Sequence, residues 1–148
     1  MEKFWAALLV IPIFMWYSFH AVLDRDFRIK QQTIENTVYQ YTQIAAKKGA
    51  LYNSVYDELQ IKLSNFGEFN VIVTAEKFTG TNDNPEVIAD LEVIGRELRQ
   101  EGYDIINVYV EGLEEHPLGK LYELTPFGTK SGAEADIRYF AKASVYIQ

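Results

Sequence analysis

The sequence contains no cysteine, and it has only two histidines and two methionines among its 148 residues. Without cysteine the chain has no disulfide, no thiolate nucleophile and no thiolate ligand for a metal. It also lacks the G-x-S-x-G, Walker, G-x-G-x-x-G and H-E-x-x-H motifs that mark common hydrolases, nucleotide-binding proteins and metalloproteases. We therefore expect a protein that is not an enzyme, with no catalytic residue, no metal and no cofactor.

The remaining candidates for chemistry are few and favour structural roles. His20 lies near the edge of an apolar segment, where we expect its ring to reach toward water. His116 follows two glutamates in EEHPLG, and adjacent residues rarely point at one ion, so this segment predicts a solvated loop rather than a metal site. A third candidate is a group of four residues whose side-chain oxygens could bind Ca²⁺: Asn82, Asp83, Asn84 and Glu86. Because they lack the spacing of an EF-hand loop, we expect a turn followed by a helix cap rather than a calcium site.

Charge is distributed unevenly along the chain. The net charge is −7, yet residues 24–50 carry +2 and residues 51–148 carry −9. Because an acidic surface repels phosphates, residues 51–148 do not favour direct contact with nucleic acid. The acidity also keeps this part of the chain soluble.

The longest apolar feature is an unbroken run of twenty uncharged residues, Phe4–Leu23. As a helix this run would extend about 30 Å, which matches the hydrocarbon core of a bilayer. The run is longer than a usual signal-peptide core, and a cut after Ala21 would place Phe19 where a small residue is needed. We therefore expect a retained membrane anchor rather than a cleaved signal peptide.

The charges beside this anchor and the family resemblance favour opposite orientations in the membrane. Arg25, Arg28 and Lys30 follow the run directly, and the positive-inside rule would place them in the cytoplasm. The family resemblance described below implies the opposite orientation.

The helical pattern continues beyond the apolar run. Leu23, Phe27, Ile34, Val38, Tyr41 and Ala45 fall close to one line on a helical wheel, and Trp16 continues the same line. This periodicity predicts one helix from about residue 3 to about residue 48, closed by Lys47, Lys48 and Gly49. We divide the chain into an anchor (residues 1–23), a stem (24–50) and an acidic α+β head (51–148).

Further elements follow in the head. Leu51, Val55, Leu59 and Leu63 predict a second helix, and a stripe from Val87 to Leu98 predicts a short third one. Strict alternation predicts strands over 69–76, 106–110 and 137–147, with a further short strand at 120–124. Short connections favour antiparallel pairing, so the fold class is α+β with a long N-terminal helix and a small antiparallel sheet.

Two segments carry a family resemblance: IAAKKGALYNSVYDELQIKL at 44–63 and GRELRQEGYDIINVYV at 95–110. With the apolar N-terminal run, they resemble the type IV pilins, in detail the TadE-like minor pilins and related proteins of Gram-positive mobile and conjugative elements. The resemblance implies a lollipop-like fold and a subunit held in the cytoplasmic membrane until assembly machinery adds it to a filament at the bacterial cell surface. It also implies that the partners are the membrane, that machinery and other copies of the same chain.

The sequence departs from the family pattern near its start. Pilins usually carry a glutamate at the fifth position of the mature chain, whereas this position is Trp5 and the nearest acid is Glu2. By the resemblance, either a leader is removed before this numbering begins, in which case Glu2 is the candidate partner-pairing acid, or the N-terminus is unprocessed. Pro12 matches the mid-anchor proline around which pilin helices become extended.

The function we expect is that of a structural subunit that polymerises through its N-terminal helix into a filament or pseudopilus. The alternative is a single-span accessory protein of a secretion or conjugation apparatus. The residues expected at subunit contacts are Glu2, Phe4, Trp5, Leu8, Leu9, Ile11, Pro12, Phe14, Trp16, Phe19, Leu23, Phe27, Ile34, Val38 and Tyr41.

Overall fold

The computed structural model describes residues 2–78, 85–89, 92–119 and 137–148. The chain divides into two compact units. The helical unit comprises Met1–Lys30 and Glu115–Ile137, and the sheet unit comprises Gln31–Glu114 and Arg138–Gln148. The division into anchor, stem and head stays a prediction.

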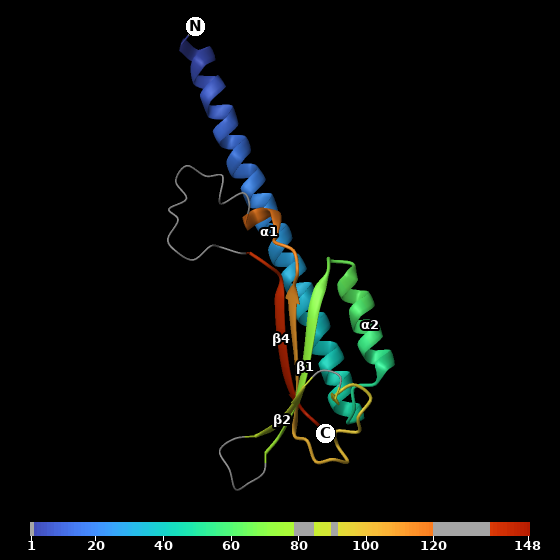
Figure 1. Cartoon of the computed structure of the whole chain (residues 1–148). Helices are drawn as coiled ribbons and strands as arrows, with labels where there is room; N and C mark the ends of the chain where they lie inside the picture. The colour runs from blue at the N-terminus through green and yellow to red at the C-terminus, as the bar shows by residue number, and fades with distance from the viewer. Residues whose placement is uncertain (1, 79–84, 90–91, 120–136) are drawn as a thin grey trace. The chain divides into compact units, whose positions relative to one another are not determined.

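The first helix, α1 (Glu2–Lys48), contributes residues to both units (Figure 1). Its bounds confirm the predicted long N-terminal helix, which continues through Pro12. At its end Gly49 has a φ of 69°, its N–H donates to the Ala46 carbonyl over 3.2 Å, and the Ala50 N–H donates to the Ala45 carbonyl over 3.2 Å. This pair of bonds is a Schellman motif, which accounts for the stop at the predicted glycine.

The sheet unit combines the end of α1 with α2 (Asn53–Ser64) and four described strands. The strands are β1 (Phe69–Lys77), β2 (Glu86–Ala89), β3 (Ile105–Gly112) and β4 (Phe140–Tyr146). Over the described residues they form one antiparallel sheet in the order β2-β1-β3-β4. The α+β class, the long N-terminal helix and the antiparallel sheet are thus confirmed, whereas the predicted strand at 120–124 lies outside the described residues.

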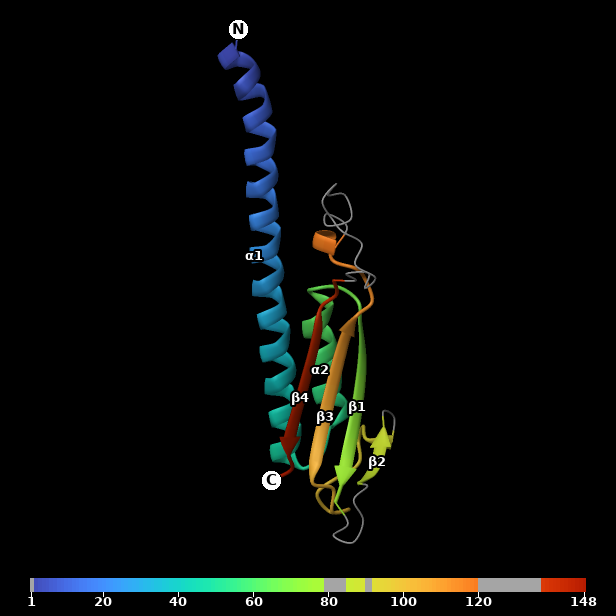
Figure 2. The ribbon, with the colours of Figure 1, turned by 90° about the vertical axis from the view of Figure 1, so that its left-hand side faces the viewer.

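The core of the sheet unit lies on one face of the sheet. Val73, Val108 and Ala143 are cross-strand neighbours on that face, and all three are buried. Val55, Leu59 and Leu63 form the buried stripe of α2, which Figure 2 shows behind the strands. The alternating apolar residues of the strands and the apolar residues spaced by four in α2 therefore form one buried apolar layer.

Strand β4 lies beside the second half of α1 (Figures 1 and 2). The Gln31 side chain accepts a hydrogen bond from the Phe140 N–H over 3.3 Å and donates one to the Phe140 carbonyl over 2.5 Å. At the other end the Gln148 N–H donates to the Ala46 carbonyl over 3.2 Å. The two Gln31 bonds occupy the N–H and the carbonyl of Phe140, which an edge strand would otherwise leave open to another chain.

The helix predicted between Val87 and Leu98 is wrong. Residues 86–89 form the edge strand β2, in which Ile88 pairs with Ala75, and Ile94 forms a parallel bridge with Leu51. Gly95 has a φ of 82°, outside the helical region. Four-residue apolar spacing is ambiguous over so short a segment, and pairing with β1 decided the outcome.

The segment 92–104 instead forms turns that close one end of the sheet unit. The Gly95 N–H donates to the Leu51 carbonyl over 2.7 Å, and the Arg99 N–H donates to the Gly49 carbonyl over 3.0 Å. A Cβ added at Gly49 would lie 2.7 Å from the Arg99 Cβ, so this contact admits only glycine. The junction between α1 and α2 therefore requires glycine at position 49 for two reasons: the positive φ of Gly49 and its close contact with Arg99.

Replacing Gly49 by alanine should destabilise the sheet unit more than the same change at Gly95. Both substitutions introduce left-handed backbone strain of about 1–2 kcal/mol. Only Gly49→Ala adds a clash with Arg99, because a Cβ at Gly95 would meet nothing closer than 3.9 Å. Denaturant unfolding of the full-length chain in detergent measures both losses, and equal losses would contradict the close packing at Gly49.

Candidate assembly surface

The N-terminal part of α1 carries a continuous apolar surface. Every residue from Val10 to Val22 is exposed except His20, which is half-buried, and Leu8 is exposed as well. Phe14 is 72% exposed, whereas Trp16 is 39% exposed. The large exposed apolar side chains of this segment are Leu8, Val10, Ile11, Ile13, Phe14, Met15, Trp16, Tyr17, Phe19 and Val22.

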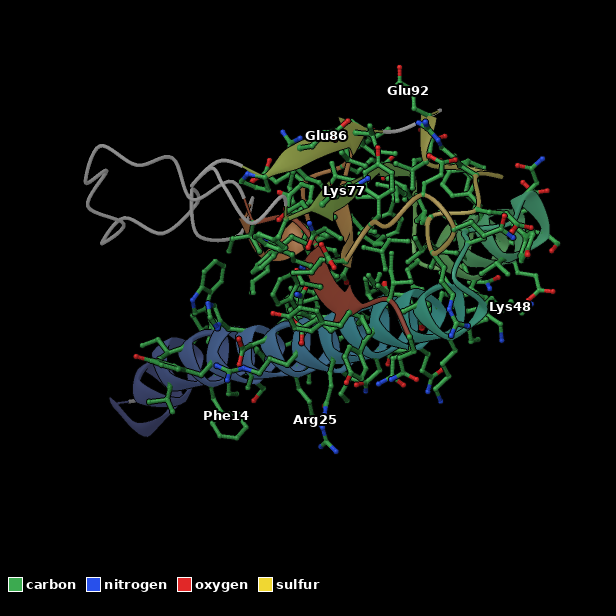
Figure 3. All side chains as sticks on the ribbon, turned by 90° about the horizontal axis from the view of Figure 1, so that it is seen from below. Phe14, Arg25, Lys48, Lys77, Glu86 and Glu92 are labelled. Atoms are coloured by element: carbon green, nitrogen blue, oxygen red, sulfur yellow. The ribbon has the colours of Figure 1, made fainter. Side chains whose placement is uncertain are left out.

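The face of α1 that includes Phe14 continues past the uncharged run. Figure 3 shows Phe14 and Arg25 projecting from the same side of the helix, as expected for residues eleven apart. Ile29 lies on this face too and is 54% exposed. The exposed apolar face thus extends beyond Leu23, with Arg25 within it.

Charges just after the run are largely neutralised within the helix. The Arg28 Nε lies 2.9 Å from a carboxylate oxygen of Asp24, and the Lys30 Nζ lies 2.8 Å from one of Asp26. Such exposed pairs four residues apart stabilise a helix by only about 0.3–0.5 kcal/mol each. Arg25 makes no ion pair with any residue that the structure describes.

Leu23 and Phe27 lie on the opposite face and are half-buried. Phe27 contacts the ring of His116 edge-on, with 5.0 Å between the ring centroids. His116 is only 7% exposed, so the prediction that it lies in a solvated loop is wrong. Sequence gave little signal of this burial, since a histidine before a proline is typical of an exposed turn.

Ile34 and Val38 belong to the core of the sheet unit, and neither exposes any surface. In this fold they are unavailable to a second subunit, so we leave them out of the assembly surface proposed below. Tyr41 is half-buried beside them, and its hydroxyl donates to Glu58 over 3.4 Å. Desolvation and the neighbouring Glu58 carboxylate raise the pKa of the Tyr41 hydroxyl.

The remaining predicted contact residues are known only by their place in α1. Glu2, Phe4, Trp5 and Leu9 are helical, but their side chains lie outside what the structure describes. Pro12 is exposed within the helix and has no N–H to donate to the carbonyl four residues earlier.

The described part of the chain bears on two further features, a metal site and a membrane span. Among these residues no three histidine, aspartate or glutamate side chains gather as a metal site would require. Nor does any helix, over the residues described, combine the length and apolarity needed to cross a bilayer. Comparisons with protein-family models, curated proteins and solved structures give no significant match to this chain.

Replacing Ile34 by alanine should cost the sheet unit about 2–5 kcal/mol of unfolding free energy, because it leaves a cavity at a fully buried position. Ile29→Ala is the matched control on the same helix, since Ile29 is exposed. Its effect should stay within about 0.5 kcal/mol. Denaturant unfolding of the two variants decides whether this part of α1 serves the core, and similar losses would argue against it.

Proposed function

We propose that this chain is a pilin-like structural subunit that polymerises through its N-terminal helix into an extracellular filament or pseudopilus. The observation that carries the proposal is the exposed apolar surface of α1 from Leu8 to Val22. Fully burying one large apolar side chain contributes about 1.5–3 kcal/mol. A surface of this size is therefore strongly driven to leave water, either into lipid or against other helices.

The structure also limits what can cover this surface. The buried stripe of the sheet unit begins at Ile34, and Phe27 is already in contact with His116. Phe14, by contrast, is 72% exposed on the other side of the helix. Packing of α1 against α1 of other copies would bury this face, and a head-to-tail interface of that kind generates an open helical filament.

The proposal includes two stages for the anchor. Before assembly the run Phe4–Leu23 lies in the cytoplasmic membrane, where its uncharged side chains meet lipid. In the filament the same side chains exchange lipid for neighbouring helices, and the acidic head, residues 51–148, faces outward. The resemblance to type IV pilins and the confirmed long N-terminal helix on an antiparallel sheet support this proposal.

Phe14→Lys should abolish fibres while leaving the sheet unit folded, because it places a charge within the surface that assembly buries. The measurement is negative-stain electron microscopy of material sheared from expressing cells, with mass spectrometry of the subunit N-terminus. Wild-type chains should yield thin uniform fibres that contain this subunit.

Ile61→Lys is the matched control, because Ile61 is 67% exposed on α2, outside the assembly surface. Its fibres should be normal. Normal fibres from Phe14→Lys would show that this surface is not the filament core. If wild-type chains form no fibres and stay intact in the membrane fraction, the single-span accessory protein becomes the better interpretation.

A further inference from the structure

His116 belongs to the segment 115–119, and its ring contacts Phe27 of α1 within the helical unit. Figure 1 shows the short helical turn of this segment in orange. The backbone N–H of His116 donates to the Ile137 carbonyl over 2.7 Å, and its carbonyl accepts from the Gly119 N–H over 2.8 Å. Residues 117–119 form a single helical turn, and Leu118 within it is buried. Hydrogen bonds of both the N–H and the carbonyl of His116 thus hold this turn in place.

The imidazole of His116 makes a bond that depends on its protonation state. Its Nδ1 accepts a hydrogen bond from the Leu118 N–H over 3.1 Å. A nitrogen that accepts a hydrogen bond needs a free lone pair, and in the imidazolium both ring nitrogens carry protons. Protonation at Nδ1 therefore removes the acceptor and sets two N–H groups against each other.

The surroundings of His116 oppose the charged form as well. Phe27 packs edge-on against the ring, and the whole residue is largely removed from water. Among the described residues, the charged groups that face it are Asp26 and Lys30 of α1, which pair with each other over 2.8 Å. Burial lowers the pKa of His116; Asp26 acts in the opposite direction, and Lys30 lowers the pKa further.

We propose that His116 is a pH-sensitive latch, which holds the turn 115–119 on α1 at Phe27 while the imidazole is neutral and releases it when Nδ1 is protonated. Because the docked form binds protons less readily than the released form, docking is fully stable above the ordinary histidine pKa of about 6.5. It weakens as the pH falls below that value, by up to about tenfold per pH unit, until the docked form itself titrates.

The latch has a consequence for assembly that rests on the proposed function, although the latch itself does not. Phe27 belongs to the predicted contact residues of α1, and His116 covers it in the docked form. Release in acid would expose Phe27 to a neighbouring helix. Subunit packing at this level of α1 would then be favoured at low pH.

The test is an NMR titration of the isotope-labelled full-length chain in detergent, from about pH 8 to about pH 4.5, a range that brackets the histidine pKa. Detergent keeps the chain unpolymerised, so the outcome is independent of filament formation. With only two histidines in the sequence, His116 and His20 are readily assigned. The midpoint of the His116 titration should lie below the ordinary value, and protection of the Leu118 amide from exchange, corrected for intrinsic rates, should fall once the pH drops below about 6.5.

Two variants separate the latch from other causes. His116→Gln keeps an oxygen that can accept the Leu118 N–H but does not titrate in this range, so its protection should not vary with pH. His20→Gln removes the other histidine and should retain the wild-type profile. If His116→Gln fails to dock at any pH, a lowered His116 midpoint together with loss of Leu118 protection below about pH 6.5, in the wild type and in His20→Gln, still decides. A His116 midpoint at or above about 6.5, or Leu118 protection that does not change across it, would overturn the proposal.

Discussion

The packing of one stripe of α1 on the sheet is the interaction on which the sheet unit depends. Ile34, Val38 and Ala45 recur at helical spacing and lose nearly all their exposed surface. On β4 the small residues Ala141 and Ala143 are buried, and Val145 on the same face is half-buried. Gln31 and Gln148 then fix the two ends of β4 to α1 by hydrogen bonds. Register and packing thus reinforce each other, because a shift of either element would break both the apolar layer and these bonds.

That stripe explains why one helix can carry two kinds of surface. Between Gln31 and Lys48 the chain itself covers one face of α1, and the exposed residues are mostly polar, apart from Tyr39 and Ile44, whereas before Val22 large apolar side chains occur on every face. A single layer can bury only one face of a helix, so the earlier segment holds more apolar area than its own chain covers within the described residues. The exposed apolar area of α1 thus follows from this imbalance rather than from any one residue.

Periodicity made most of these elements predictable. The inward positions of three strands, among them Val73, Val108 and Ala143, were already visible in the sequence as alternation, and the four-residue spacing of Val55, Leu59 and Leu63 was visible as a helical stripe. Sequence reasoning failed where tertiary contacts decide: β-branched Val87 and Ile88 satisfy a short helical pattern and a strand equally well, and pairing with β1 selects the strand. Likewise the burial of His116 depends on Phe27, nearly ninety residues away. For the candidate surface, the sequence predicted the apolar segment but could not tell that Ile34 and Val38 would be used inside the chain.

Charge sets a further condition on any assembly of this chain. Residues 51–148 carry −9, and like charges on neighbouring copies repel unless water and salt separate them by about a Debye length, ~8 Å at physiological ionic strength. On α1 Arg28 pairs with Asp24 and Lys30 pairs with Asp26, and the run Phe4–Leu23 has no charged residue. A filament that places the uncharged run at its axis and residues 51–148 at its periphery meets this condition, because the repelling groups are then farthest apart and fully solvated. The inverse arrangement would bury unpaired carboxylates, at a cost that no apolar contact on the same surface offsets.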